Sequence, residues 1–266
     1  MSELSSAKFI IDNTPVGLIQ EIDDNMKTLN SHLEESKEFK DLIMSYEEEH
    51  FKQVPLGEDK LILSKYNKDE QGYYYDQTKK YKLLINPLSE NFEKLEKITP
   101  NYPLQVLLDK KVNEYKEKYY TKEKTSHNIF YEEKDNKCKV KVLLSSHHIE
   151  LKNYQTGEWI ACYVISPKDQ GEYSIEGEIK INTFYYEENN TQFHLEEKVT
   201  ETIKASTDEE LCNKIIELIE SKENKIQTDL TEAFDSFEEE YTKPLRRRLP
   251  MTRMKMNWSL NQLALK

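Results

Sequence analysis

Glycine, cysteine and long hydrophobic runs are scarce in this sequence, and each scarcity excludes a class of protein. All six glycines precede position 178, and no GxGxxG or GxxxxGK(S/T) motif occurs, which excludes the glycine-rich loops that hold phosphates. The three cysteines are odd in number and widely spaced, which favours reduced thiols in the cytoplasm over a disulfide framework. No run approaches about 18 apolar residues, and the N-terminus lacks the regions of a signal peptide, so we expect neither a membrane span nor a secretion signal.

Motifs for catalysis and for metal binding are also missing. The patterns HExxH, CxxC, DxDxDG and GxSxG do not occur. His147 and His148 are adjacent in a predicted strand, so they point to opposite faces and cannot share a metal. Acidic runs at residues 47–49 and 238–240 are typical of solvated helix faces. The sequence therefore predicts a binding protein that is not an enzyme and uses no metal or cofactor.

What the sequence does contain is a separation of charge. The whole chain has a formal net charge of −12, yet residues 243–266, here called the C-terminal arm, hold seven basic residues and no acidic one. The rest of the chain therefore carries −19. Such asymmetry is typical of an interaction arm on an acidic body. The basic residues of the arm are Lys243, Arg246, Arg247, Arg248, Arg253, Lys255 and Lys266.

The spacing of apolar residues predicts helices at the N-terminus. Pro15 suits the first position of a helix, and apolar residues follow it at steps of three and four. A second helix is expected to begin at Ser36. Hydrophobic residues make up only 36% of the chain, which favours an elongated protein or one that needs a partner. We expect a small antiparallel helical bundle here.

Further along, the pattern changes from helix to strand and back. Short strands are expected at residues 61–63 and 73–85, and a helix at 104–119. From Asn128 apolar residues alternate, which predicts an antiparallel meander of about four strands with turns such as residues 154–157. The expected segments are a helical part at 1–54, small strands and a connecting helix at 55–125, the meander at 126–200, a long helix at 201–242 and the arm at 243–266.

The long helix and the sheet together predict a partner. Ser206 and Thr207 each have a glutamate three residues on, the signature of a capping box. An apolar stripe then runs without glycine or proline until Pro244, which gives a helix of about 30 residues. Such a helix is longer than its own sheet is wide, so it would lie across the sheet and project onto a neighbour. The fold class is α+β, with a sheet edge left for a partner that continues it.

The residues of the arm are consistent with several targets. A flexible basic tail or a nuclear-localisation-like run is the simplest interpretation. Nucleic-acid binding is the usual alternative for arginine-rich segments, but the acidic body would repel a polyphosphate. An acidic protein surface fits better, because arginine binds carboxylates in a bidentate manner and the methionines and Trp258 add adaptable apolar contacts. An acidic lipid headgroup is the third target.

Three motifs in the second half of the chain resemble those of a known family. In the arm, residues Leu245, Arg246, Arg247, Leu249, Pro250, Thr252, Arg253, Lys255 and Trp258 have the spacing of the signature end of the actin filament capping protein alpha subunits. Asn153, Tyr154, Gly157 and Trp159 are similar to the turn and tryptophan strand of that family. Residues 184–187 with Asn190 and Gln192 are similar to its long strand and hairpin.

The resemblance implies a heterodimer of an alpha and a beta subunit, in which three N-terminal helices of each subunit form a stalk. It implies one continuous antiparallel sheet built from both subunits, with the two long helices across it. The arm corresponds to the family's C-terminal tentacle, which binds the barbed end of the actin filament and blocks subunit addition and loss. The implied partners are the capping protein beta subunit, the barbed end and phosphoinositides, which compete for the same basic surface, with no nucleic acid. The implied location is the cytoplasm and cytoskeleton.

Actin contacts are carried over to matching positions of the arm. The resemblance implies that Lys243, Arg247 and Lys255 make the main electrostatic contacts, with Arg246, Arg253 and Trp258 beside them. The sequence departs from the family where Glu158 and Ile160 replace two arginines that flank the strand tryptophan. Only eight residues follow Trp258, fewer than is usual in the family, so we expect a weaker grip at the tip of the arm. A phosphoinositide-binding peripheral protein is the alternative function.

Overall fold

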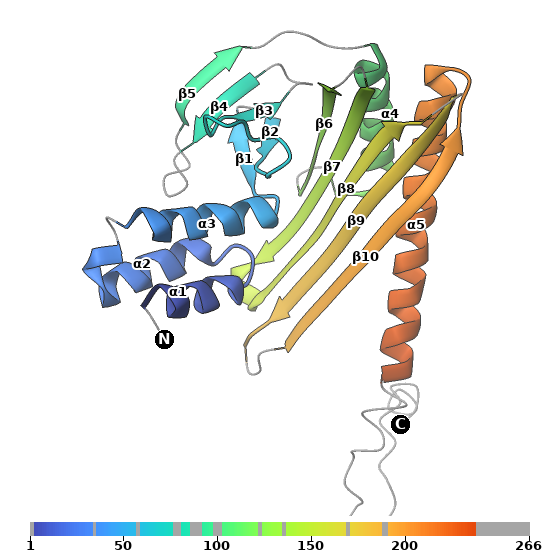
Figure 1. The fold of residues 1–266 in the computed structure, drawn as a ribbon. Helices are drawn as coiled ribbons and strands as arrows, with labels where there is room; N and C mark the ends of the chain where they lie inside the picture. Colours follow the sequence, from blue (N-terminus) through green and yellow to red (C-terminus); the bar gives the residue numbers. More distant parts are fainter. Residues whose placement is uncertain are drawn as a thin grey trace, which may run out of the picture. The chain divides into compact units, whose positions relative to one another are not determined.

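The structure of the 266-residue chain is a computed structural model (Figure 1). It describes residues 3–33, 36–56, 59–76, 81–85, 92–97, 103–121, 124–134, 137–168, 171–187 and 191–237. The chain divides into two compact units, Met1–Ile216 and Glu217–Lys266. The first unit contains most of the described elements, and the fold class is α+β, as predicted.

Three helices form the N-terminal part of the first unit. They are α1 (Glu3–Asp12), α2 (Ile19–Leu29) and α3 (Lys37–Glu49), and α1 packs against both others (Figure 1). Ser36 caps α3 as predicted, because its Oγ accepts a hydrogen bond of 3.3 Å from Phe39 N. The shared core is apolar and consists of Ala7, Ile11, Ile19, Leu33, Phe39, Ile43 and Tyr46.

The prediction that a helix starts at Pro15 is wrong. The segment after α1 is a turn, in which Thr14 Oγ1 donates to Ile10 O at 2.8 Å and so closes the end of α1. Gly17 then adopts a φ of +90°, a left-handed conformation that breaks the helical path, and α2 begins only at Ile19. The prediction failed because Val16, within this turn, has the same spacing as the apolar residues of α2 and was therefore counted as part of one helical stripe.

Two small sheets and one helix follow α3. Strands β1 (Gln53–Leu56) and β2 (Asp59–Ile62) form an antiparallel pair, and β3 (Tyr74–Asp76), β4 (Tyr81–Ile85) and β5 (Phe92–Lys97) form a three-stranded antiparallel sheet. Helix α4 spans Pro103–Tyr119, close to the predicted range.

The large sheet has five strands, one more than the meander predicted. They are β6 (Thr125–Lys134), β7 (Lys137–Glu150), β8 (Gln155–Pro167), β9 (Glu172–Tyr185) and β10 (Thr191–Lys204), all antiparallel and in the order β10-β9-β8-β7-β6. Residues 125–130 are all buried, so β6 lacks the alternation by which the other strands were recognised.

The predicted turn at residues 154–157 is shifted. The chain turns at Leu151–Asn153, and Tyr154 follows in the left-handed region with a φ of 52°. Strand β8 then begins at Gln155, so Thr156 and Gly157 already pair with β7 and β9. The turn forms three residues earlier than predicted, and Tyr154, rather than Gly157, adopts the positive φ.

Helix α5 spans Asp208–Phe237, and one face of the large sheet, here called the helix face, packs against α4 and the first residues of α5. Leu108 of α4 and Leu211 and Ile215 of α5 line a cavity of about 280 Å³ together with residues of β6–β9, among them Val140 and Ile165. The registers place the following residues on the same face: Val142, Leu144, Trp159, Ala161, Tyr163, Ile175, Ile179 and Ile181. From Glu217 onward α5 belongs to the second unit, so a helix that crosses the whole sheet stays a prediction.

The opposite face, here called the hairpin face, packs against the end of α3 and the β1–β2 hairpin. Its apolar core contains Phe51, Ile62, Phe130, Leu143, Ile160 and Cys162. Ser126 Oγ donates to Lys60 O at 3.1 Å, which fixes the hairpin beside β6. No helix within the described ranges has the length and the apolar character that crossing a membrane would need.

Candidate functional site

The predicted actin-binding residues lie outside the described residues. This holds for Lys243, Arg246, Arg247, Arg253, Lys255 and Trp258 alike. Description ends at Phe237 in α5, six positions before Lys243. The described structure therefore defines the base that carries the arm rather than the arm itself.

The start of α5 is fixed by the capping box that the sequence predicted. Thr207 Oγ1 accepts from Glu210 N at 3.2 Å, and the carboxylate of Glu210 accepts from Ser206 N at 2.8 Å. The hydrogen bond from Lys214, followed by that from Ser206 N, lowers the pKa of Glu210. Lys214 also donates to Lys204 O at 2.7 Å, so the helix start is attached to the last residue of β10.

Strand β10 is an edge of the sheet that the described chain leaves open. It spans 14 residues and pairs with β9 along its whole length. No other strand of the described chain pairs with its outer side. Val199 is buried, whereas Glu196, Glu197 and Lys198 beside it are exposed. A long open edge is a template for pairing with another chain.

The other edge of the sheet, β6, is covered by the chain itself. Gln105 Nε2 of α4 donates to Ile129 O at 2.7 Å, and Asn128 Nδ2 donates to Tyr75 O at 3.4 Å. The whole segment of residues 125–130 is buried. The two edges are therefore not equivalent, and among the described residues β10 is the edge left open to a partner strand.

A buried carboxylate joins the N-terminal helices to the large sheet. Glu158 of β8 lies on the hairpin face with a side chain that is 0% exposed. Its Oε1 is 2.6 Å from Nδ1 of His50, the residue after α3, and accepts a further hydrogen bond from Asn182 Nδ2 of β9. His147 Nε2 of β7 is 3.6 Å from Oε2, an electrostatic contact rather than a hydrogen bond, and 2.9 Å from His50 O.

Electrostatics keep this carboxylate ionised. Burial by itself would raise the pKa of Glu158, but the interactions with His147 and His50 outweigh it and lower the pKa to about 2. Conversely, burial and the negative charge of Glu158 raise the pKa of the neighbouring Tyr46 hydroxyl far above its ordinary value. Tyr46 therefore stays a neutral donor, and its OH bonds Thr14 O at 2.7 Å. The cluster acts as a polar joint between two parts of the fold.

A cavity of about 420 Å³ lies beside this joint. Its walls come from the segment after α1, from α2, from the end of α3 and from β1 and β7, and they include Val16, Ile19, Gln20, Lys52, Gln53 and Ile149. Lys52 Nζ is already paired with Glu47 Oε1 at 2.8 Å. Gln53 Nε2 donates to Ser145 O at 2.7 Å. The polar groups thus serve to hold the walls together.

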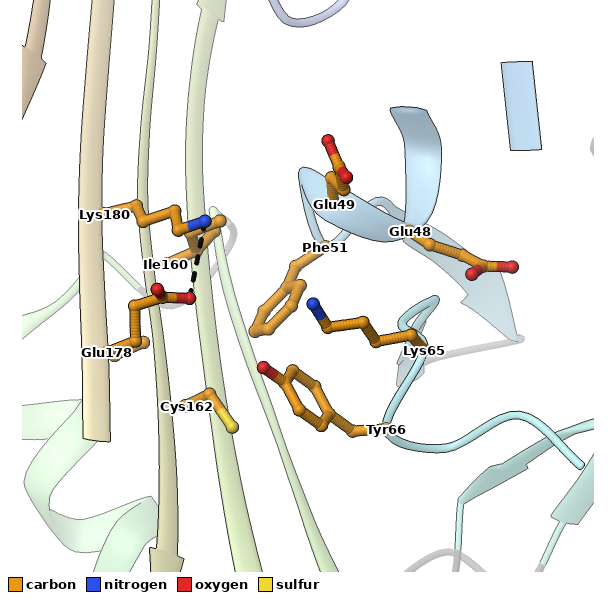
Figure 2. A pocket seen from close by; sticks show the side chains of 10 residues that line it. Glu48, Glu49, Phe51, Lys65, Tyr66, Ile160, Cys162, Glu178 and Lys180 are labelled. Carbon is orange, nitrogen blue, oxygen red and sulfur yellow. Dashed lines mark ion pairs between the residues drawn. The ribbon is translucent and has the colours of Figure 1, made fainter. Parts of the chain in front are cut away.

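A smaller cavity on the hairpin face contains the thiol of Cys162 (Figure 2). It encloses about 50 Å³ between the sheet and the side chains of Phe51, Lys65 and Tyr66. Lys180 and Glu178 form an ion pair of 3.4 Å at its rim. Burial raises the pKa of the Cys162 thiol to about 12, which favours the protonated thiol over the reactive thiolate.

The sequence correctly predicted that His147 and His148 point to opposite faces of the sheet, but it did not reveal the role of His147. His147 and His148 do point to opposite faces, as predicted: His148 Nε2 is 3.0 Å from Glu150 Oε1, away from Glu158. His147, interpreted as an ordinary strand residue, belongs to the polar joint. The available signal was Glu158 itself, a charge on the strand face that also holds Ile160 and Cys162. No group of side chains within the described ranges could hold a metal ion.

Comparisons with known proteins agree in placing the chain among actin-capping subunits. The family model described as F-actin capping protein alpha subunit matches residues 7–265. The F-actin-capping protein subunit alpha of Candida glabrata is 29% identical over 259 residues, covering 94% of this chain and 90% of the relative. That of Neurospora crassa is 26% identical over 254 residues, covering 93% and 89%.

The fold is also similar to a solved one. The structure of a homodimeric actin capping protein alpha subunit from Plasmodium berghei covers 86% of this chain and 91% of that chain, with a TM-score of 0.76 and 19% identity. At this identity the likeness concerns the fold alone. Helix and antiparallel-sheet content agree with the expectation drawn from the sequence.

Proposed function

Because the chain belongs to the F-actin capping protein alpha subunit family, whose members cap actin filaments, we propose that it is the alpha subunit of a heterodimer that binds filament barbed ends. Family members are actin-binding proteins of the cytoskeleton and not enzymes. On this proposal the complex occupies the barbed end in the cytoplasm and blocks addition and loss of actin subunits without covalent chemistry.

The observation that carries the proposal is the extent of the family match. It runs through residue 265 and so includes the C-terminal arm, where seven basic residues stand against a body of −19. In the proposed mechanism the arm is the actin-binding element, with Lys243, Arg247 and Lys255 as the main cations and Arg246, Arg253 and Trp258 beside them. Positive charge steers association with an acidic surface and raises the association rate, most strongly at low salt.

The open β10 edge supports the second half of the proposal, an obligate partner. A partner strand beside β10 would satisfy the outward backbone groups and continue the five-stranded sheet. The proposed partner is the capping protein beta subunit. The solved Plasmodium berghei protein is homodimeric, so a second copy of this chain is the competing occupant.

Co-expression followed by a seeded elongation assay tests the function. The chain is co-expressed with a capping protein beta subunit, and the complex is added to actin seeds that grow from pyrene-labelled monomers. We expect inhibition of barbed-end growth and unchanged growth of seeds whose barbed ends are already blocked. Expressed alone, the chain is expected to aggregate, because its sheet edge stays open.

The same material tests the alternative function. Vesicles of neutral phospholipid, with and without a phosphoinositide, are sedimented with the complex. Phosphoinositide binding together with seed inhibition is expected, since both ligands would use the basic arm. Vesicle binding without any inhibition of seeds would overturn the capping proposal in favour of a peripheral membrane protein.

A further inference from the structure

The helix-face side chains of β10 form a largely apolar row that two acidic residues, Glu197 and Glu201, interrupt. Glu197 lies opposite Ile179 of β9, between Leu195 and Val199 of its own strand. The row also contains Phe193 and Ile203, and Glu201 lies opposite Ile175 between Val199 and Ile203. Glu197 itself is exposed, and no described side chain forms an ion pair or a hydrogen bond with it. When a partner strand covers the row, a carboxylate within it loses water, which is unfavourable unless the partner supplies a cation.

Self-pairing of β10 would place like charges opposite each other. In an antiparallel pair of two copies, the two-fold axis passes through one residue of β10, which then faces its own copy. An axis through Glu196, Glu197 or Lys198 near the middle of the strand sets that charge against itself. An axis through Val199 sets Glu197 against Glu201. An axis further from the centre avoids these contacts but shortens the paired segment.

We infer that Glu197 is a specificity-determining residue of the β10 edge: it disfavours a second copy of this chain and selects a different chain whose edge strand carries a basic side chain opposite it. This inference rests on the proposed heterodimer and adds the chemistry of the partner strand. Such a strand is apolar on the helix side, where it meets Leu195 and Val199, and has lysine or arginine at the position facing Glu197. Repulsion of the wrong partner and attraction of the right one thus come from the same carboxylate.

Subunit exchange in the co-expressed complex tests the inference. Complexes that carry a fluorescent label on the wild-type or the variant chain are mixed with an excess of unlabelled wild-type complex, and exchange is followed at low and high salt. Glu197→Lys is expected to exchange about 5- to 10-fold faster than wild type, with Glu197→Gln between them. The control is Glu176→Lys, the same charge change at an exposed residue of β9 on the hairpin face. Exchange of Glu197→Lys at the wild-type rate would overturn the inference.

Self-association of the chain expressed alone gives an independent readout. Chemical crosslinking and native mass spectrometry of the soluble fraction are expected to show more dimer for Glu197→Leu than for wild type, because the apolar row is then unbroken from Phe193 to Val199. Equal dimer fractions for the two would contradict the inference.

The seeded elongation assay distinguishes failure of the inference about Glu197 from failure of the proposed capping function. If the wild-type complex caps but Glu197 substitutions change nothing, only the inference about Glu197 fails. If no complex with a beta subunit forms, the heterodimer proposal fails and the inference fails with it.

Discussion

His50 Nδ1 lies 2.6 Å from Oε1 of Glu158, and this contact joins the end of α3 to the middle strand of the large sheet. The two residues are 108 positions apart in the sequence. His147 and Asn182 complete the surroundings of the carboxylate from β7 and β9. In the family that the sequence resembles, an arginine is expected at the position of Glu158. The two histidines account for how a carboxylate is accommodated there.

Glu158→Gln is expected to lower the free energy of unfolding of the complex by about 3 kcal/mol, because it removes the charge that the two imidazoles surround. Chemical denaturation at neutral pH measures this. The matched control is Glu176→Gln, an exposed glutamate on the same face of the sheet. A loss no larger than that of the control would contradict the role of the polar joint.

The same substitution should change the acid response. Since the folded pKa of Glu158 is lowered to about 2, its stabilising contribution is complete above the ordinary carboxyl value of 4.5 and is lost as the pH falls between these two values. Wild type should therefore lose stability over this interval more steeply than Glu158→Gln. Denaturation series at several pH values measure the slopes, and parallel slopes would refute the assignment.

Gly177→Ala is expected to destabilise the sheet through steric conflict rather than backbone strain. A Cβ at Gly177 would lie 2.7 Å from Cδ1 of Tyr163, whose side chain is fully buried on the helix face. The ring cannot move without displacing its neighbours, so we expect a loss of about 1–3 kcal/mol. Thermal unfolding of the complex measures it, with the exposed Glu176→Ala as control. Tyr163→Phe/Gly177→Ala should not restore stability, because the ring remains.

Replacement of Lys243, Arg247 and Lys255 with alanine should leave the heterodimer intact and slow capping. We expect the association rate at low salt to fall by about tenfold or more, and the salt dependence to weaken, because three steering charges are lost. Seeded elongation at several ionic strengths measures both. A variant with three exposed lysines of the body changed to alanine, Lys37, Lys110 and Lys152, controls for net charge. Equal inhibition by arm variant and wild type would show that the arm is not the actin-binding element.

Trp258→Ala should change the rate at which the complex dissociates from capped filament ends. A large apolar anchor at an interface sets residence time more than encounter, so we expect faster dissociation of capped ends with a nearly unchanged association rate. Dilution of capped seeds into fresh actin monomers measures the dissociation. Trp159→Phe, on the helix face of the sheet, is the control for loss of an indole elsewhere. A change confined to the association rate would contradict the anchoring role.

The sequence by itself determined the secondary structure of most elements, because strands exposed on one face and amphipathic helices carry visible periods. It located the capping box of α5, the helix α4 and four strands of the meander. It also determined the family, through spacing in an arm that the described structure does not reach. It failed at β6, where burial on both faces removed the period, and at Gly17 and Tyr154, where a positive φ decided the turn.

Only the tertiary structure decided which groups meet. The asymmetry of the two sheet edges follows from long-range contacts such as Gln105 with Ile129, which no local pattern encodes. The pairing of Glu158 with His50 and His147 depends on the packing of α3 against the sheet. No local sequence pattern therefore marks any of the three residues as part of a cluster. The isolation of Glu197 became visible once the register with Ile179 was known. Local propensity acts over a few residues, whereas charge pairing and strand order depend on which distant segments fold together.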